Sequence, residues 1–201
     1  MSKSVFNPEE QNLDISSKIV VGLQRVSEAF KVLLWEKAKL IGLSPIQIQL
    51  LIFISYHKAA LCNVSHLAKE FNVTKPTISD AIKALDKKKL VFKDHSIPDS
   101  RSYLIRLSEL GKIVVLNIND FSDSLHTIVK DMPEYEQESF YKTLSTVIYK
   151  LNKNDILQEQ RTCFTCKFYS KNDSTHYCNL LNKQLYSSEI RLDCSEFENE
   201  N

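Results

Sequence analysis

The sequence predicts a mainly α-helical protein with one small β-hairpin and a cysteine-rich C-terminal tail. Three observations lead to this fold class. Over most of the 201 residues, apolar side chains recur at spacings of three and four, which is typical of amphipathic helices. One short stretch near the middle alternates between apolar and polar residues, as strands do. Four of the five cysteines lie between positions 163 and 194.

The first long helix is predicted from five apolar residues at spacings of 4, 3, 4 and 3: Ile19, Leu23, Val26, Phe30 and Leu33. This spacing places the five side chains on one face, as in a helix that packs along a second helix. Gly42 marks the end of this helix, and Ser44, Pro45 and Gln47 form a start signal for the next one. The apolar face of this N-terminal segment is therefore expected to pack along another helix.

Two short helices joined by a tight turn are predicted between positions 64 and 88. The first has apolar residues at i, i+3, i+4 and i+7: Val64, Leu67, Ala68 and Phe71. Asn72 and Val73 form the turn, and Thr74 can cap the second helix, whose first turn tolerates Pro76. The second helix has a single apolar face, so its other face is expected to be exposed: Thr77, Ser79, Asp80, Lys83 and Lys87.

A β-hairpin is predicted next, because residues 90–92 are apolar and strand-like and residues 103–107 alternate with a strand period. The basic, polar segment between them contains Pro98 and Asp99 as a turn signal. Two long helices, separated by Pro133, follow the hairpin. Their apolar faces are formed by Val114, Ile118, Phe121, Leu125 and Ile128, and by Phe140, Leu144, Val147, Ile148 and Leu151. These two helices are therefore expected to be amphipathic.

The middle of the chain is basic, although the chain as a whole is almost neutral. Residues 64–107 hold nine Lys and Arg against five Asp and Glu, a net charge of +4, whereas the whole chain carries +1. A local basic excess suits a polyanion, and two short helices followed by a hairpin form a compact reader of DNA. A major groove admits one helix and displays the donors and acceptors of the base edges. Residues 43–110 are therefore expected to be a winged helix-turn-helix domain that binds DNA.

Eight residues are the candidates for contact with double-stranded DNA. Short side chains on the exposed helix face can reach base edges: Thr77, Ser79, Asp80 and Lys83. Lys75, Lys87 and Lys88 are better placed to contact phosphates, and Arg101 at the tip of the hairpin can enter the neighbouring minor groove. Asp80 is also a candidate for a structural role, because phosphates repel a carboxylate that lacks a base or cation to pair with. The plain alternative for each residue is a solvated surface side chain.

These segments resemble the MarR (multiple-antibiotic-resistance regulator) family of winged-helix repressors. The matching segments are residues 64–68 (VSHLA), 73–79 (VTKPTIS), 82–88 (IKALDKK), 90–91 (LV), 99–102 (DSRS) and 107–111 (LSELG). The resemblance is strong over residues 43–111, and the flanking helices extend it to residues 12–152. Lys89 departs from the pattern, because the family usually has glycine there, and a left-handed backbone costs lysine about 1 kcal/mol.

The resemblance implies a homodimer that represses transcription at pseudo-palindromic operators. Its dimerisation segments would be the N-terminal helix in residues 1–42 and the C-terminal helices in residues 111–152, which agrees with their apolar spacings. It implies that Asp99 holds Arg101 for insertion into the minor groove. Because Ser102 and Tyr103 follow Arg101 where the family often has further basic residues, we expect modest affinity in that groove. It also implies a small-molecule effector, bound between the dimer helices and the DNA-binding domain.

The clustered cysteines, Cys163, Cys166, Cys178 and Cys194, predict a metal site in a module formed by residues 153–201. The first two lie in a Cys-x2-Cys turn, and the two later ones can complete a tetrahedron around Zn²⁺. We expect structural zinc, with an apolar shell of Phe164, Phe168, Tyr177, Leu180, Leu181 and Phe197. Three alternatives stay open: a [4Fe–4S] cluster, a thiol redox switch without metal, and a site in which His176 replaces one cysteine. Cys62 is expected to be a small core residue.

Other classes of protein receive little support from the sequence. Three glycines do not suffice for a glycine-rich phosphate loop, and the five histidines are scattered, so an enzyme is not expected. No apolar run reaches 18 residues, and the polar N-terminus lacks the apolar stretch of a signal peptide, so we expect a cytoplasmic protein without membrane contact. The competing hypothesis is a redox or iron–sulfur sensor, or an electron-transfer protein, in which the cysteine module is the active part.

Overall fold

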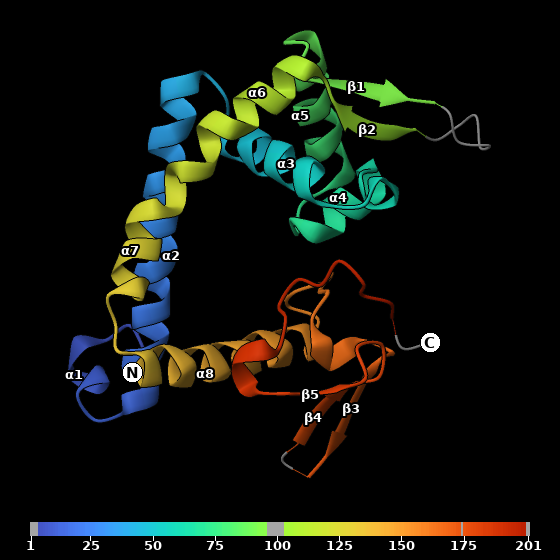
Figure 1. Cartoon of the computed structure of the whole chain (residues 1–201). Helices are drawn as coiled ribbons and strands as arrows, with labels where there is room; N and C mark the ends of the chain where they lie inside the picture. The colour runs from blue at the N-terminus through green and yellow to red at the C-terminus, as the bar shows by residue number, and fades with distance from the viewer. Residues whose placement is uncertain (1–3, 96–102, 174, 200–201) are drawn as a thin grey trace.

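The computed structural model describes residues 4–95, 103–173 and 175–199, and the chain is bent into an open C (Figure 1). The long helix α2 (Ile15–Ile41), which follows the short helix α1 (Pro8–Gln11), forms the spine of the C. Helices α3 to α6 and a β-hairpin project from one end of α2. Helix α8 and the C-terminal module project from the other end, on the same side (Figure 1).

The boundary between α2 and α3 (Pro45–Tyr56) is fixed by the signals that the sequence predicted. Gly42 ends α2 with a left-handed backbone, φ 66°. Ser44 then begins α3 with a capping box, in which its hydroxyl accepts from the Gln47 amide and the Gln47 side chain accepts from the Ser44 amide.

No single helix in the described parts of the chain is long and apolar enough to cross a membrane; only α2 and α3 taken together meet that test, and they are bent by 91°.

The hydrophobic core lies mainly between α3, α4 (Val64–Glu70), α5 (Lys75–Lys87) and the hairpin. Its largest fully buried side chains include Ile48, Leu50, Leu51, Leu67, Ile78, Ile82, Leu85 and Ile105. Cys62, which follows the short 3₁₀ helix η1 (Ala59–Leu61), is also buried, and burial raises the pKa of its thiol to about 11. The prediction that Cys62 is a core residue is therefore confirmed.

Both helices of the helix-turn-helix end in the same way. Asn72 after α4 and Lys89 after α5 adopt left-handed backbones, with φ 55° and 58°. In each case the next amide donates to a carbonyl five residues earlier, at 2.9 Å for Val73 and 3.0 Å for Leu90. This is the Schellman closure of a helix C-terminus. Lys89 thus takes the conformation that glycine would favour, because the closing hydrogen bonds hold it there.

The predicted hairpin is present as two antiparallel strands, β1 (Val91–Asp94) and β2 (Leu104–Leu107). Val91 lies opposite Leu107, and Asp94 lies opposite Leu104. The amide of Ile105 donates to the Cys62 carbonyl at 2.8 Å, which attaches the hairpin to the core. The tip of the hairpin, residues 96–102, lies outside the described residues.

The helix that follows the hairpin is broken, whereas the sequence suggested one continuous apolar repeat up to Ile128. Its three parts are α6 (Glu109–Ile118), the 3₁₀ helix η2 (Asn119–Ser122) and α7 (Asp123–Lys130). Ser108 caps α6 as predicted. At the break, Asp120 Oδ1 forms an ion pair with Lys37 Nζ of α2 at 2.5 Å. The Phe121 and Phe30 rings pack edge to face, with 5.3 Å between their centroids. These contacts attach η2 to α2, and α7 continues beside it (Figure 1).

The C-terminal module contains a small antiparallel sheet that the sequence analysis did not predict. After α8 (Glu134–Lys153), its elements are η3 (Cys163–Thr165), β3 (Tyr169–Asn172), β4 (Thr175–Cys178), β5 (Lys183–Leu185) and η4 (Ser187–Glu189). The strands are ordered β3-β4-β5. Tyr149 of α8 packs against Phe164, with 5.2 Å between ring centroids, so α8 carries the module.

Gly111→Ala is expected to lower the free energy of unfolding by about 1–3 kcal/mol. A Cβ atom at this position in α6 would collide with the Leu90 carbonyl oxygen, which is backbone and cannot swing aside. Urea denaturation measures the effect. Gly22→Ala in α2 is the matched control, because nothing lies within 4 Å of the added atom there and alanine favours a helix. Equal free energies of unfolding for the two variants would contradict this prediction.

Candidate functional site

The face of α5 that was predicted to read DNA is uncovered in the described chain. The four apolar residues of α5, Ile78, Ala81, Ile82 and Leu85, are buried in the core. The opposite face points away from the core, with Lys75, Thr77, Asp80, Lys83 and Lys87 exposed and Ser79 half-buried. One helix thus separates its apolar and polar sides cleanly, and it presents six of the eight predicted DNA-contact residues together.

Two hydrogen-bonded threonines, Thr74 and Thr77, lie at the N-terminus of α5. Thr74 caps the helix by accepting from the Thr77 amide at 3.3 Å. The two hydroxyls are also hydrogen bonded, with 2.9 Å between their oxygens. The cap therefore fixes the orientation of the Thr77 hydroxyl while leaving the side chain exposed, and the free amides of this helix end suit an anion.

Two charged groups on α5 form an ion pair on the exposed face. Lys83 Nζ lies 3.0 Å from Asp80 Oδ1, and the two side chains are 70% and 74% exposed. A pair this exposed contributes little to stability, so a phosphate or base can readily displace Asp80 as the partner of Lys83. Lys88 is placed differently, since its Nζ donates to the Gly42 carbonyl at 2.8 Å and so joins the ends of α5 and α2.

The hairpin extends this basic surface beside α5. Arg106 Nε donates to Asp94 across the two strands at 2.9 Å, and Lys93 Nζ lies 4.7 Å from the centroid of the Tyr103 ring. Arg101 and Asp99 lie outside the described residues, so their roles stay predictions.

The C-terminal module brings the four predicted cysteines around one pocket of about 440 Å³. Cys163 and Cys166 flank η3, Cys178 ends β4, and Cys194 follows η4. All four are free thiols. Within residues 4–95, 103–173 and 175–199, however, no group of three or more His, Cys, Asp or Glu side chains is arranged to hold a metal ion. The four cysteines therefore line one pocket, in which their thiols are the sulfur donors.

Two nitrogen donors point at the cysteine sulfurs. The Arg191 amide donates to Cys163 Sγ at 3.2 Å, and the Arg191 guanidinium donates to Cys194 Sγ at 3.5 Å. Burial raises the pKa of the Cys163 thiol, although the Arg191 amide opposes this rise. His176, an alternative ligand in the sequence analysis, lines a different pocket, and its Nδ1 is 2.6 Å from the Tyr169 hydroxyl. It is not among the residues around the cysteine pocket.

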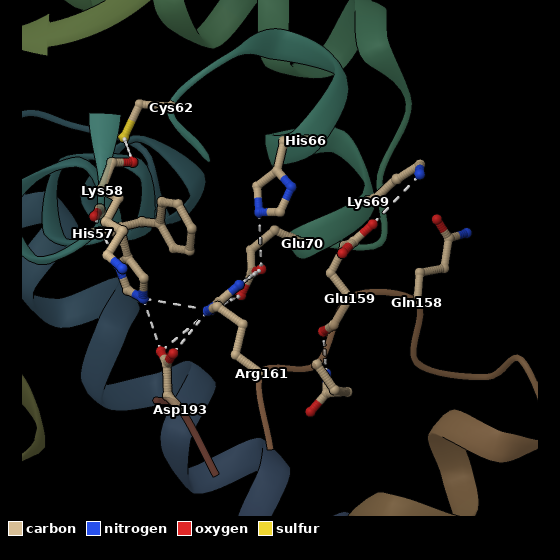
Figure 2. A network of polar contacts seen from close by, with 12 residues as sticks. His57, Lys58, Cys62, His66, Lys69, Glu70, Gln158, Glu159, Arg161 and Asp193 are labelled. Carbon is tan, nitrogen blue, oxygen red and sulfur yellow. Dashed lines mark hydrogen bonds and ion pairs between the residues drawn. The ribbon is translucent and has the colours of Figure 1, made fainter. Parts of the chain in front are cut away.

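A buried arginine joins the cysteine module to the helix-turn-helix, and the sequence analysis missed it. Arg161 donates to both oxygens of Glu70 in α4, at 2.6 and 3.1 Å (Figure 2). It also donates to both oxygens of Asp193, at 2.7 and 3.2 Å. Its guanidinium carbon lies 5.2 Å from the centroid of Phe53 in the core. One side chain thereby makes two bidentate contacts and an aromatic contact.

His57, at the end of α3, completes this network (Figure 2). Its Nε2 is 2.8 Å from Asp193 Oδ2, and its Nδ1 is 2.8 Å from the Phe53 carbonyl. Burial by itself would lower the pKa of His57, but the hydrogen bonds to these two oxygens raise it. The hydrogen bond from His57, together with those from Arg161, holds the pKa of Asp193 well below its usual value. Asp193 is therefore an anion held by both Arg161 and the His57 ring.

The one sign of this network in the sequence is that two of its charged residues stand close to cysteines of the module. Arg161 stands two residues before Cys163, and Asp193 stands one residue before Cys194. Two backbone hydrogen bonds cross between these segments, from the Cys194 amide to the Arg161 carbonyl and from the Cys163 amide to the Arg191 carbonyl, both at 3.0 Å. The same segments thus carry two cysteines of the pocket and two of the charged residues that contact the helix-turn-helix domain.

Comparisons with known proteins agree with this geometry. The model of the MarR family matches residues 41–102, which end before the cysteine module begins. The crystal structure of an S. aureus MepR–DNA complex is similar, with a TM-score of 0.57 and 23% identity over 64% of this chain and 94% of that chain. A MarR transcriptional regulator from Methanosarcina mazei Go1 gives a TM-score of 0.56 and 20% identity over 69% of this chain and 97% of that chain. No curated protein matches the chain. The chain therefore has the winged-helix fold of these regulators.

Arg161→Ala is expected to lower the free energy of unfolding by about 3–5 kcal/mol, because it leaves the carboxylate of Glu70 in a mostly buried position without its partner. The Arg161 and Glu70 side chains are only 10% and 15% exposed. Chemical denaturation followed by circular dichroism measures the change.

Lys58→Ala is the matched control for Arg161. Lys58 pairs with Glu196 across the same interface at 3.5 Å, but the two side chains are 61% and 56% exposed, so its loss should cost about 0–1 kcal/mol. Arg161→Lys should behave more like the alanine variant, because an ammonium cannot make two bidentate contacts. A loss as small for Arg161→Ala as for Lys58→Ala would show that the buried network does not stabilise the fold.

Proposed function

We propose that this chain is a sequence-specific DNA-binding transcription regulator that represses its targets as a homodimer. The observation that carries the proposal is the uncovered polar face of α5, at the second helix of a helix-turn-helix and next to a basic hairpin. A solved structure with a similar fold is a MepR–DNA complex, which supports the same use of the fold here. The proposed division is residues 1–42 and 111–152 for dimerisation, 43–110 for DNA binding and 153–201 for the cysteine module.

In the proposed complex, α5 enters the major groove of the operator. Thr77, Ser79 and Lys83 face the base edges, since they lie on the outer face of the helix. Lys75 and Lys87, at the two ends of α5, contact phosphates. Asp80 orients Lys83 through their ion pair, or accepts from a cytosine amino group. Arg101, at the hairpin tip, enters the adjacent minor groove.

The proposed dimer is supported by apolar side chains that the described chain leaves exposed. Of the five-residue repeat predicted on α2, Phe30 packs within the chain against Phe121. The N-terminal part of the repeat remains exposed, and so do apolar residues on α6 and α7: Ile19, Leu23, Val26, Ile113, Leu116 and Ile128. A two-fold dimer formed there would place two α5 helices about 34–36 Å apart, which matches successive major grooves of a pseudo-palindromic operator.

A small-molecule effector belongs to the proposal as an expectation from the resemblance. A pocket of about 240 Å³ lies between the end of α2 and α6, lined by Ile41, Leu43, Leu90, Leu110 and Val114 among others. This is the region between the dimerisation helices and the DNA-binding domain in which the resemblance places an effector.

Lys83→Ala is expected to weaken binding to a specific operator by about 1–3 kcal/mol, because it removes a donor from the base-reading face. Fluorescence anisotropy at fixed salt, with a duplex selected from a random pool by the unaltered protein, measures the affinity. Lys31→Ala is the matched control: Lys31 also lies on a helix, also forms an i,i+3 ion pair at 3.0 Å, and is 60% exposed.

If both lysine variants lose the same affinity, the loss reflects overall charge and the reading role of α5 is wrong. If neither variant changes the affinity, Lys83 takes no part in recognition. A loss that is uniform across operator sequences, with a salt dependence reduced by about one ion, would identify Lys83 as a phosphate contact instead.

Leu23→Glu is expected to convert the dimer into a monomer, because it places a charge in the apolar contact along α2. Sedimentation equilibrium measures the mass. Gln24→Glu is the matched control, since it adds the same charge at the adjacent exposed position outside the apolar repeat. Dimers of unchanged stability in the Leu23 variant would exclude this part of α2 from the interface.

A further inference from the structure

The cysteine module has a pocket whose lining identifies the chemistry of its ligand. Four thiols face it, together with apolar and aromatic side chains that include Tyr141, Phe168, Leu185 and Ile190. The carboxylates in the lining are already paired: Glu189 with Lys183 at 2.6 Å, Asp193 with Arg161 and His57, and Glu196 with Lys58. The thiols are therefore the donors that remain, and an all-sulfur donor set selects a soft metal.

We propose that Cys163, Cys166, Cys178 and Cys194 bind one [4Fe–4S] cluster, in place of the zinc ion that their spacing first suggested. A zinc ion needs its four sulfurs about 2.3 Å from one point, and hence about 3.8 Å from one another. In a cluster each thiolate binds a different iron, so the four sulfurs lie further apart around a shared space, and a pocket of about 440 Å³ that all four cysteines line offers such a space.

The hydrogen bonds to sulfur support the same assignment. The Arg191 amide and guanidinium donate to Cys163 and Cys194, which lie 31 positions apart in the chain. Hydrogen bonds to the ligand sulfurs and exclusion of solvent are two of the means by which proteins stabilise and tune iron–sulfur clusters. Arg191 provides the first, and apolar side chains form part of the lining of the pocket.

The position of the cluster site links it to the DNA-binding domain, a consequence that rests on the proposed function. Arg161 and Asp193 are fixed by the segments that carry Cys163 and Cys194, and Arg161 holds Glu70 of α4 (Figure 2). Ligation of the cysteines at one centre tightens both segments, and loss of the centre releases them. Cluster-loaded and cluster-free protein should therefore differ in DNA affinity, by about 5- to 150-fold if the coupling is of ordinary size.

The first experiment measures metal content. The full-length chain is purified without oxygen, and iron, acid-labile sulfide and zinc are measured along with visible absorbance. The proposal expects about four iron and four sulfide per chain, directly or after anaerobic reconstitution with ferrous iron and sulfide, and a brown colour that a chelator removes. One zinc per chain, with no iron taken up on reconstitution, would overturn it. So would disulfides among the four cysteines in anaerobically purified protein.

Variants then test the ligand set. Cys178→Ser should reduce bound iron to background, whereas Cys62→Ala, which alters the buried cysteine outside the module, should keep the full iron content. Retention of the cluster by Cys178→Ser would overturn the ligand assignment. Because loss of a ligand can also unfold the module, the metal content of the unaltered protein stands as a test on its own.

The last measurement separates this inference from the proposed function. DNA affinity of cluster-loaded and chelator-treated protein is compared by anisotropy on the same selected duplex. A difference supports the link through Arg161, and its disappearance in Arg161→Lys would locate that link. Equal affinities would overturn the link. If neither form binds DNA specifically, the proposed function fails, while the iron and sulfide analysis still decides the cluster.

Discussion

The arrangement of the molecule depends on one buried guanidinium. Arg161 is 9% exposed, and it holds Glu70 of α4 and Asp193 of the module at the same time. A buried charge is costly unless every donor is matched, and two bidentate carboxylates match this one. The C-shaped chain is thereby closed on its open side, where the ion pairs Lys69–Glu159 and Lys58–Glu196 also cross between the two parts (Figure 1).

The parts of the fold that were predictable are those that depend on local physical rules. Caps at Ser44, Thr74 and Ser108, and the apolar spacing along α5, were correct because each involves residues within one or two turns of a helix. The break at η2 was missed, because it depends on contacts with α2 that are far away in sequence. The sheet β3–β5 was missed because strands of three or four mostly polar residues carry no apolar alternation.

The two candidate sites also differ in how much of each could be predicted from the sequence. The reading face of α5 follows from periodicity alone, so its residues could be named without coordinates. The cysteine spacing predicted a shared site, and the four side chains do surround one pocket. Whether four thiols converge on a point or surround a space is a question of distance, which spacing in the chain does not contain. The contact between Arg161 and Glu70 spans 91 positions, and nothing in the sequence marks Glu70 as its partner.

The hydrogen bond from Lys88 to the Gly42 carbonyl affects the spacing at which the two subunits of a dimer would contact DNA. It places a cation on the C-terminal end of α2, where the helix dipole favours one, and it does so from the end of α5. Helix α5 is thus attached to the C-terminal end of α2, and the N-terminal part of α2 would lie at the two-fold axis of the dimer. In such a dimer, the tilt of α2 at the two-fold axis sets the distance between the C-terminal ends of the two α2 helices. It thereby sets the distance between the two α5 helices.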